Sequence, residues 1–461
     1  MRTTKQKECI QVSPPLRHTF SRAKRRALAL TLTLCMVLAL VPVFTMTASA
    51  AVCEIDGKGV YDSLADALLD ADPGDTIVLT DNIDCDPIVL GKAIAFQLGD
   101  NTLTIGDEDE SGTALECDGD YIVAAFFGSG KVIINGDVTA RADNEETCGV
   151  WAGIGAEVTV NGDVEVNGGD DGAKVCGVYA NNGATVTVNG DITVSGGGDG
   201  AEVSGVWAIE SAVTVSGSID VSGGGDGDGY KTLYVFGVEA KDAVVEVGGD
   251  ITVESSGTDR TMPLGVSAYD DAEVIVGNIT VSGDAAQGVV ADYDATVTVN
   301  GNIKVSGDEA EGVSTESGAA VTVNGSITVP DDGYYIVFDG VPPKSKGQND
   351  AASAKYGYLQ YSCEFDPGVW GYVWVKEEPK AAKVKYYQDS MDNEIPGSES
   401  TAFGEYYSGK RLTPADVTDD FKQGWLDAEK PGSRYRVALV SYPTITGDPG
   451  RDVVKVLYKY L

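Results

Sequence analysis

Apolar and polar residues alternate along most of the chain between residues 130 and 330, and the alternation returns at a nearly fixed period. The phrase GVYANNGATVTVNGDITVSGG at 177–197 returns as GVVADYDATVTVNGNIKVSG from Gly288 onwards. Each unit holds three short alternating segments rich in Val, Ile and Thr, which predict strands rather than helices. A repeat of this length is typical of a stacked-unit architecture.

A Gly-Val pair opens each unit, and successive pairs lie 28, 28, 32, 28, 23 and 24 residues apart. The pairs begin at Gly149, Gly177, Gly205, Gly237, Gly265, Gly288 and Gly312. The shortest spacing suits a coil of three strands and three corners, in which each strand pairs in parallel with its copy one turn away. Gly and Asn-Gly tolerate positive φ and would form the corners. Asn-Gly also occurs in two-residue hairpins, but the next repeat offers every strand an identical partner, which favours the coil.

The alternation predicts which side chains point into the coil. One inward column comprises Val138, Val164, Ile192, Ile219, Ile251, Ile279, Ile303 and Ile327, and another comprises Val160, Val188, Val215, Val247, Val276, Val299 and Val323. β-Branched residues suit strands and fill a narrow core. The outward column beside them comprises Thr159, Thr187, Thr214, Glu246, Ile275, Thr298 and Thr322. Regular Thr ladders can bind ice, but Glu246 and Ile275 interrupt this one.

The open end of such a coil needs a cover. The sequence SLAD at 63–66 fits a capping box, and Pro73-Gly74 would end the helix that follows it. We therefore predict a short helix over Ser63–Asp72 that closes the N-terminal mouth. The stretch at 75–105 would form the first, irregular coils.

The first fifty residues have a different character. Basic residues from Arg17 to Arg26 precede an apolar stretch at 27–44, and Ala48-Ser49-Ala50 forms a small-residue cleavage box. This order predicts a cleaved signal peptide over residues 1–50, although the apolar stretch is also about long enough to span a bilayer. The long basic region resembles signal peptides of Gram-positive bacteria. We expect a secreted protein that has no transmembrane segment after cleavage.

The charge and the histidine content exclude several functions. The chain carries a formal net charge of −38, and the signal segment is basic, so the remainder is more acidic still. Such a surface repels phosphate backbones, and nucleic acid is not expected as a partner. The single histidine, His18, lies in the signal segment. Without an imidazole, the mature chain has no Ser-His-Asp or Cys-His machinery and no His-containing zinc site.

Six cysteines follow the signal segment, and secretion would permit disulfides between them. They are Cys53, Cys85, Cys117, Cys148, Cys176 and Cys363. Cys148 and Cys176 each stand directly before a Gly-Val pair, so stacking would place them about 4.8 Å apart, within disulfide range. A disulfide and a pair of buried thiols fit this position equally. The sequence does not pair the other cysteines.

Residues 51–340 resemble a right-handed parallel β-helix of the pectate-lyase-like superfamily, and most of all its low-complexity versions in bacterial surface proteins. The resemblance implies an all-β solenoid and does not by itself imply a function. The composition changes at 341–380, which we interpret as a linker or transition segment. Its aromatic residues Trp370, Tyr372 and Trp374 are candidates for binding a glycan, although such residues more often belong to a core.

Residues 381–461 begin and end with alternating strands, VKYYQD at 384–389 and VVKVLY at 453–458. The pattern is similar to the mucin-binding-protein (MucBP-like) β-grasp modules of Gram-positive surface proteins. The residues that match are Val384, Tyr386, Asp389, Ile395, Val454, Val456 and Tyr458, and Asn393 replaces the Gly usual in the first turn. A short helix would begin near Pro414. No sortase-type LPxTG motif occurs, so the sequence assigns no mode of attachment to a cell wall.

Acidic residues gather in one group of Gly-rich loops, where the extra residues of the longer units fall. The candidate calcium ligands there are Asp170, Asp171, Asp199, Asp226 and Asp228. Gly- and Asp-bearing loops of this kind resemble calcium-binding nonapeptide repeats. The strict nine-residue period is absent, which favours an ordinary solvated loop. Lyases and hydrolases on this fold use acidic clusters, but no particular carboxylate pair stands out for glycoside hydrolysis.

These observations favour a secreted or cell-surface, non-enzymatic and adhesin-like protein of a Gram-positive bacterium. The β-helix would serve as a stalk, and the MucBP-like module would bind host or environmental glycans, mucin-type ligands or cell-wall polysaccharide. No cofactor is expected apart from the candidate calcium ions. The alternative is a calcium-dependent polysaccharide lyase or glycoside hydrolase on the β-helix.

Overall fold

The computed structural model describes most of the chain after the predicted signal segment. The described residues are 51–107, 112–118, 124–141, 147–168, 174–196, 201–224, 233–256, 261–388, 390–392, 394, 400–408, 410–413, 435–445 and 453–460. The predicted signal segment, 1–50, lies outside them.

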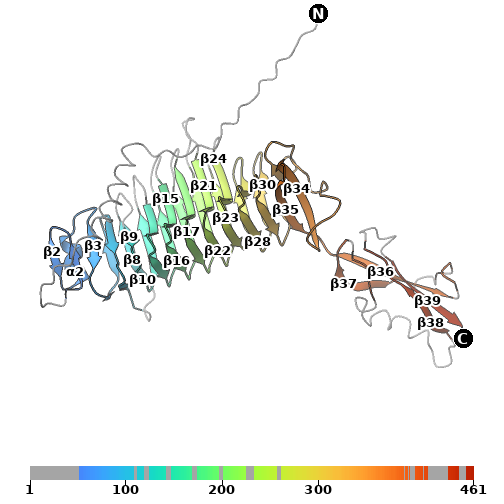
Figure 1. Ribbon diagram of the computed structural model, residues 1–461, viewed down its shortest axis with the longest axis horizontal. Coiled ribbons are helices and arrows are strands. Elements are labelled where there is room, and N and C mark those ends of the chain that lie inside the picture. The colour runs from blue at the N-terminus through green and yellow to red at the C-terminus, as the bar shows by residue number, and fades with distance from the viewer. Residues whose placement is uncertain are drawn as a thin grey trace, which may run out of the picture. The chain divides into compact units, whose positions relative to one another are not determined.

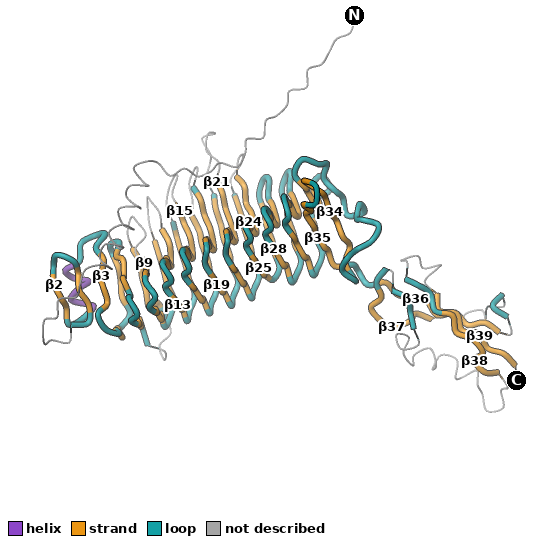
Figure 2. Tube along the Cα trace, in the orientation of Figure 1, coloured by secondary structure: helices purple, strands orange, loops and turns teal. Residues whose placement is uncertain are grey.

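Three long sheets, here called A, B and C, form a parallel β-solenoid in which every regular turn gives one strand to each sheet (Figures 1 and 2). Neighbouring strands pair in parallel, except that β1 lies antiparallel to β2 and β3 and that β34 lies antiparallel to β35. This is the all-β parallel β-helix that the repeat period predicts.

The strands of each sheet follow one another in order along the solenoid. Sheet A has the order β2 (Gly59–Tyr61), β1 (Cys53–Ile55), β3 (Thr76–Leu79), β6 (Ile94–Gln97), β9 (Ala124–Phe127), β12 (Thr147–Gly153), β15 (Lys174–Asn181), β18 (Glu202–Ile209), β21 (Leu233–Lys241), β24 (Thr261–Tyr269), β27 (Gln287–Ala291), β30 (Glu311–Thr315) and β33 (Tyr334–Phe338). Sheet B has the order β34 (Tyr358–Asp366), β35 (Val369–Lys376), β31 (Ala320–Val323), β28 (Thr296–Val299), β25 (Glu273–Val276), β22 (Val244–Val247), β19 (Ala212–Val215), β16 (Thr185–Val188), β13 (Glu157–Val160), β10 (Lys131–Ile134), β7 (Thr102–Ile105) and β4 (Ile83–Cys85). Sheet C has the order β32 (Ile327–Thr328), β29 (Ile303–Ser306), β26 (Ile279–Ser282), β23 (Ile251–Ser255), β20 (Ile219–Gly223), β17 (Ile192–Gly196), β14 (Val164–Asn167), β11 (Asp137–Arg141), β8 (Thr113–Asp118) and β5 (Ile88–Leu90).

Both inward columns predicted from the alternation are buried and in register. In sheet C, Ile219 pairs with Ile192 on one side and with Ile251 on the other. Every member of the two columns is at most 4% exposed. The outward Thr column is aligned too, and Glu246 and Ile275 interrupt it as expected. Each buried Val or Ile contributes roughly 1.5–3 kcal/mol, so the stacked columns are the main source of stability.

The glycine of each Gly-Val pair is required for a steric reason. Each of these glycines lies where sheet A approaches the inward column of sheet C. A Cβ atom on Gly237 would lie 2.5 Å from the carbonyl oxygen of Gly265 and closer still to Cγ2 of Ile251. Gly205 and Gly265 face the same two kinds of neighbour. Because the backbone φ of Gly237 is not in the left-handed region, glycine is needed here for space rather than for conformation.

Polar side chains stack at the corner between sheets B and C. Asn161 Nδ2 donates to Asn135 Oδ1 at 2.7 Å, and Asn189 Nδ2 donates to Asn161 Oδ1 at 2.8 Å. Beside them, Asp137 Oδ1 accepts the backbone N–H of Asp163 at 2.9 Å. These bonds satisfy corner groups that strand pairing leaves open. The Asn-Gly sites are therefore stacked corners of the coil and not hairpin turns.

The predicted N-terminal helix is present as α2 (Leu64–Asp70), at the end of the solenoid formed by β1 and β2 (Figure 2). Ser63 is its N-cap, and its Oγ accepts the backbone N–H of Asp66 at 3.2 Å. Leu64 and Ala67 are buried against the core. The helix is slightly shorter than predicted, because Ala71 already has an extended backbone.

The segment at 341–380, expected as a linker or transition segment, contributes two strands to the solenoid. β35 pairs in parallel with β31, and β34 folds back along β35. Val373 and Val375 align with Val321 and Val323 and are buried, so they prolong the inward column of sheet B. The alternation of apolar residues in β35 matches that column, which explains why this stretch joins the stack.

Residues 381–461 contain a fourth sheet, D, whose core is separate from that of the solenoid. Its strands are β37 (Ser400–Tyr406), β36 (Lys380–Gln388), β39 (Val453–Tyr460) and β38 (Tyr435–Ser441), in that spatial order. The central pair β36 and β39 is parallel and the outer strands are antiparallel, which is a β-grasp-like arrangement. Val384, Tyr386, Val454 and Val456 are buried in its core. Asp389, Asn393, Ile395 and Pro414 lie outside the described residues.

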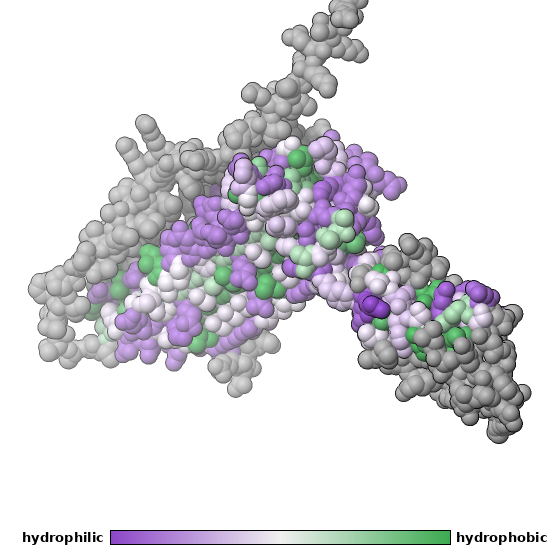
Figure 3. Space-filling model, turned by 45° about the vertical axis from the view of Figure 1, so that its right-hand side comes forward, coloured by the Kyte–Doolittle hydropathy of each residue, from purple (hydrophilic) through white to green (hydrophobic). Residues whose placement is uncertain are grey.

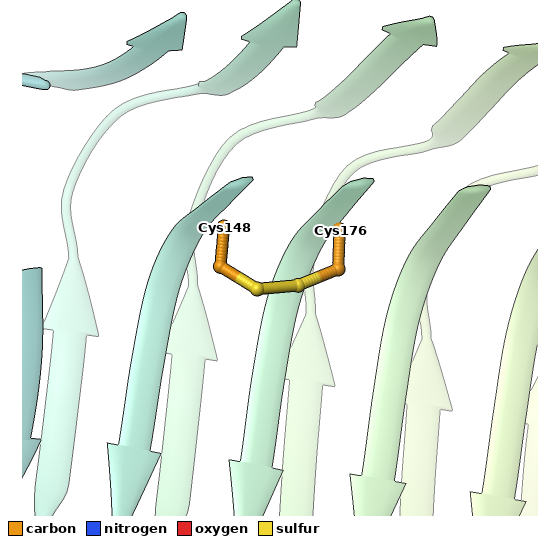
Figure 4. Close-up of a disulfide and its surroundings, with 2 residues drawn as sticks. All are labelled: Cys148 and Cys176. Atoms are coloured by element: carbon orange, nitrogen blue, oxygen red, sulfur yellow. A yellow bond between two sulfur atoms is a disulfide. The ribbon is translucent and has the colours of Figure 1, made fainter. Parts of the chain in front are cut away.

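Cys148 on β12 and Cys176 on β15 occupy paired positions and form a disulfide between adjacent turns, with Cα atoms 4.6 Å apart (Figure 4). Of the two alternatives open from the sequence, the structure has the disulfide. The other cysteines that follow the signal segment are free thiols. One of them, Cys117, lies in the core, where burial raises its pKa to about 12.

Replacing Cys148 and Cys176 together by Ala should lower stability by about 3–4 kcal/mol, because the bond closes a loop of 28 residues in the unfolded chain. The urea midpoint of the wild type should fall when reductant is added, whereas the midpoint of the double variant should not move. A wild-type midpoint that is insensitive to reductant would contradict this prediction.

Candidate functional site

Trp370, Tyr372 and Trp374, the predicted glycan-binding residues, alternate along β35 and point away from the core, since Val373 and Val375 between them are buried. The ring centroids of Trp370 and Tyr372 lie 6.2 Å apart, and those of Tyr372 and Trp374 lie 5.1 Å apart. Both pairs stack, with interplanar angles of 19° and 10°. We call these three residues the β35 row. They belong to the outer face of sheet B and not to the β-grasp-like sheet.

The two ends of the β35 row differ in their surroundings. At one end, Lys355 Nζ lies 4.0 Å from the centroid of the Trp374 ring and donates to Thr322 Oγ1 at 2.7 Å. Burial in this position lowers the pKa of Lys355. The indole nitrogen of Trp374 donates to Gln360 Oε1 at 3.1 Å. At the other end, Trp370 is 38% exposed, so it presents the most accessible ring surface of the row.

The five candidate calcium ligands are not placed by the structure. Asp170, Asp171, Asp199, Asp226 and Asp228 all lie outside the described residues. Among the residues that are described, no group of three or more Asp, Glu, His or Cys side chains could hold a metal ion. The calcium hypothesis therefore stays a prediction from the sequence.

A second group of outward side chains lies on sheet A. Trp151, Tyr179, Trp207 and Glu239 occupy paired positions on the adjacent strands β12, β15, β18 and β21. Each of them stands two residues after the glycine of a Gly-Val pair and is half-buried. We call these four residues the outer strip.

Ring contacts connect one turn of the outer strip to the next. The ring centroids of Trp151 and Tyr179 lie 5.8 Å apart, and those of Tyr179 and Trp207 lie 4.4 Å apart in a stacked arrangement. Lys174 Nζ lies 4.3 Å from the centroid of the Trp207 ring and 2.7 Å from Glu202 Oε2. The outer strip thus combines a continuous aromatic surface with charged groups at its side.

Glu239 follows the aromatic residues of the strip and has a perturbed environment. Burial, and after it the charge of Glu202, raises the pKa of Glu239 to about 7. Tyr269 Oη donates to Glu239 Oε1 at 3.1 Å. Burial and the Glu239 carboxylate also raise the pKa of Tyr269. A glutamate that is partly protonated at neutral pH can donate as well as accept a hydrogen bond, and such groups concentrate at functional sites.

Three buried polar atoms of the outer strip have no hydrogen-bond partner: Trp151 Nε1, Trp207 Nε1 and Glu239 Oε2. Seven such side-chain atoms occur in the part of the chain that the structure describes, so the strip holds an unusual share of them. Each unsatisfied atom destabilises the fold by about 1–3 kcal/mol, and native proteins keep few of them. Their concentration within four successive strands of sheet A indicates a constraint other than stability.

The outer strip was not identified from the sequence, although its signal was present. The tripeptides GVW, GVY, GVW and GVE, which begin at 149, 177, 205 and 237, place a large or charged residue at the same point of successive units. The pattern shows that these residues align once the units stack. Periodicity carries no information about burial of an outward side chain or about missing hydrogen bonds.

Raised pKa values also occur at a corner further along the solenoid. Asp292, Glu316 and Asp339 follow β27, β30 and β33, the strands of successive turns in sheet A. Burial raises the pKa of Asp292 to about 6. Burial and then a hydrogen bond with Asp339 raise the pKa of Glu316 to about 7. Because the pKa values of Asp292 and Glu316 are raised, these two groups make the stability of the fold decrease as the pH rises through those values.

The protein can be classified only by its fold, because the comparisons with known proteins found no match. No protein-family model matches the chain, and neither a curated protein nor a solved structure matches it. The described residues include no helix of the length and apolarity needed to cross a membrane. The molecule is therefore classed as a parallel β-solenoid, an architecture compatible with surface proteins and with proteins that act on or bind polysaccharides.

Proposed function

We propose that the protein is a secreted or cell-surface glycan-binding protein that acts by binding rather than by turnover. The observation that carries this proposal is the β35 row, three stacked aromatic rings on an outward sheet face with an exposed tryptophan at one end. The apolar C–H face of a pyranose packs well against an aromatic ring, while its hydroxyls keep their hydrogen bonds to water and polar side chains.

The residues that flank the β35 row suit such a ligand. β31 carries the small residues Ala320 and Thr322 beside the row, and β34 carries Ser362 and Glu364 on the other side. The small side chains leave room for a sugar beside the rings, and the exposed Glu364 carboxylate offers it a hydrogen-bond acceptor. Where the surface in Figure 3 is coloured, hydrophilic residues are common and hydrophobic ones are interspersed among them.

The cellular setting is inferred from the sequence. The signal-like segment at 1–50 supports secretion, and the resemblance of 381–461 to MucBP-like modules supports an adhesin-like role in a Gram-positive bacterium. The β-grasp-like order of sheet D is compatible with a module of that kind. In this proposal the solenoid is a stalk that also binds, and its ligand is a host, environmental or cell-wall glycan.

Trp370→Ala should reduce retention on the best glycans of an array by about tenfold, because loss of ring stacking removes roughly 1 kcal/mol or more of binding free energy. Tyr334→Ala is the matched control, since Tyr334 is 41% exposed on β33 and lies outside the β35 row. Equal retention of the two variants and the wild type would refute the assignment of the β35 row.

A second candidate function, a polysaccharide lyase or glycoside hydrolase, is favoured by one observation. Glu239 has a pKa of about 7 and could supply a proton to a leaving group, and Glu202 lies close enough for its charge to help raise that pKa. Incubating the chain with polysaccharides, with and without calcium, separates the two functions. Release of shorter products that Glu239→Gln abolishes would favour the enzyme, and retention without products favours the binding protein.

A further inference from the structure

The outer strip on sheet A carries unsatisfied hydrogen-bonding atoms, and these give it binding properties that do not depend on the β35 row. Its three unsatisfied atoms are themselves buried, but they belong to half-buried side chains that point outward from β12, β18 and β21, so a ligand bonds them once these side chains turn outward. Trp151 and Trp207 are two turns apart, which corresponds to about 9.6 Å along the axis. A ligand that relieves all three must therefore be extended and carry several polar groups along its length.

The types of unsatisfied atom define the polar groups that the ligand needs. The two indole N–H groups can only donate, so they require acceptor oxygens. Glu239 Oε2 can accept a hydrogen bond when ionised and donate one when protonated. A hydroxyl group satisfies both requirements with a single oxygen, and the aromatic rings between the unsatisfied atoms suit the C–H faces of sugar rings.

The charges near the strip disfavour an anionic ligand. Glu202 and Glu239 are acidic, and Lys174 already pairs with Glu202 at 2.7 Å. The whole chain carries a formal net charge of −38, so a polyuronate would be repelled before it reached the strip.

We infer that the outer strip is a binding site for a neutral, hydroxyl-rich saccharide that lies along the solenoid axis. Trp151 and Trp207 donate to its oxygens, Glu239 bonds one of its hydroxyls, and Tyr179 packs against a sugar ring between them. The fold keeps the three atoms unsatisfied in the free state because the ligand satisfies them in the bound state. The site differs from the β35 row in its sheet, its residues and its need for hydrogen bonds.

The test uses a chain in which the β35 row is already disabled by Trp370→Ala. This variant is titrated calorimetrically with neutral hexasaccharides of glucose, xylose and mannose, and with the hexasaccharide of galacturonic acid. Trp207→Phe is then added, because it keeps an aromatic ring on a smaller side chain and removes the indole N–H donor. Tyr334→Phe likewise keeps an aromatic ring and removes a donor, but Tyr334 lies on β33 outside the outer strip and the β35 row, so this variant serves as the control.

At least one neutral hexasaccharide should bind the Trp370→Ala variant. Trp207→Phe should weaken that binding about tenfold, while Tyr334→Phe leaves it unchanged. The inference is overturned if no neutral hexasaccharide binds, if Trp207→Phe has no effect, or if galacturonic acid binds better. Binding by the wild type that Trp370→Ala abolishes would support the β35 row and reject the outer strip. Binding that survives Trp370→Ala without any loss would support the strip and reject the row.

Discussion

Gly237→Ala should destabilise the solenoid by about 3 kcal/mol, the upper end of the range for overpacked cores. The added methyl group would lie 2.5 Å from the carbonyl oxygen of Gly265 and nearer still to Ile251. A side chain can often rotate away from such a contact, but a backbone carbonyl held in a parallel ladder cannot. We expect a marked fall in the unfolding midpoint, measured by circular dichroism in urea.

The control for this substitution is Gly347→Ala. Gly347 is exposed, and a Cβ atom there would meet nothing within 4 Å. Its replacement should change stability by less than about 0.5 kcal/mol, as for other surface positions. If the two substitutions lowered stability equally, the glycines of the Gly-Val pairs would not be required by a close approach of sheets A and C.

Stability should fall by about 3 kcal/mol between pH 4.5 and pH 8 through Glu239 alone. The native state holds the Glu239 proton up to about pH 7, whereas an ordinary glutamate releases it near pH 4.5. Between these values the folded chain binds more protons than the unfolded chain, so rising pH favours unfolding. The cause is burial, and the charge of Glu202 adds to it.

Glu239→Gln removes this proton and keeps an acceptor oxygen for the hydroxyl of Tyr269. The variant should therefore be more stable than the wild type at pH 8 and similar to it at pH 4.5, as measured by urea unfolding at both values. Asp292 and Glu316 have raised pKa values as well, so the stability of the variant should still decline as the pH rises, but by less than that of the wild type. Glu246→Gln, at an exposed position of β22, should leave the wild-type decline intact. A parallel shift of Glu239→Gln at both pH values would contradict the prediction.

The sequence predicts the solenoid well because one short alternation is repeated many times. The alternation of a single turn would not show which strand pairs with which. When the same alternation recurs, as at Ile192, Ile219 and Ile251, only one register places all the apolar residues inside. The same logic places α2, since a capping box before an apolar face needs no long-range information. Alternation predicts the first and last strands of sheet D, whereas its β-grasp-like order was expected only from the resemblance of 381–461 to MucBP-like modules.

Two features could not be read from the sequence for physical reasons. The approach of sheet A to sheet C that excludes a Cβ at Gly237 depends on the distance between two sheets, and no local pattern encodes it. The role of 341–380 was obscured because the antiparallel return of β34 breaks the repeat, so β35 joins the stack without a recognisable unit around it. The β35 row is predictable in part because aromatic residues crowd into the segment at 341–380.

The two aromatic groups use one property of the solenoid in different ways. Outward residues at the same position of successive turns stack into a column along the solenoid axis. Outward residues at alternate positions of one strand form a row along that strand. The outer strip is a column across β12, β15, β18 and β21, and the β35 row runs along one strand. A glycan that contacts both would meet rings oriented along two different directions, which favours separate ligands or separate parts of one polymer.

The most direct test of a glycan-binding solenoid is a crystal structure of the chain with an oligosaccharide that it retains on an array. A sugar ring stacked on Trp370 at the end of the β35 row is the result that our interpretation predicts. Sugar density confined to sheet D, with the outward aromatic residues of the solenoid unoccupied, would contradict it.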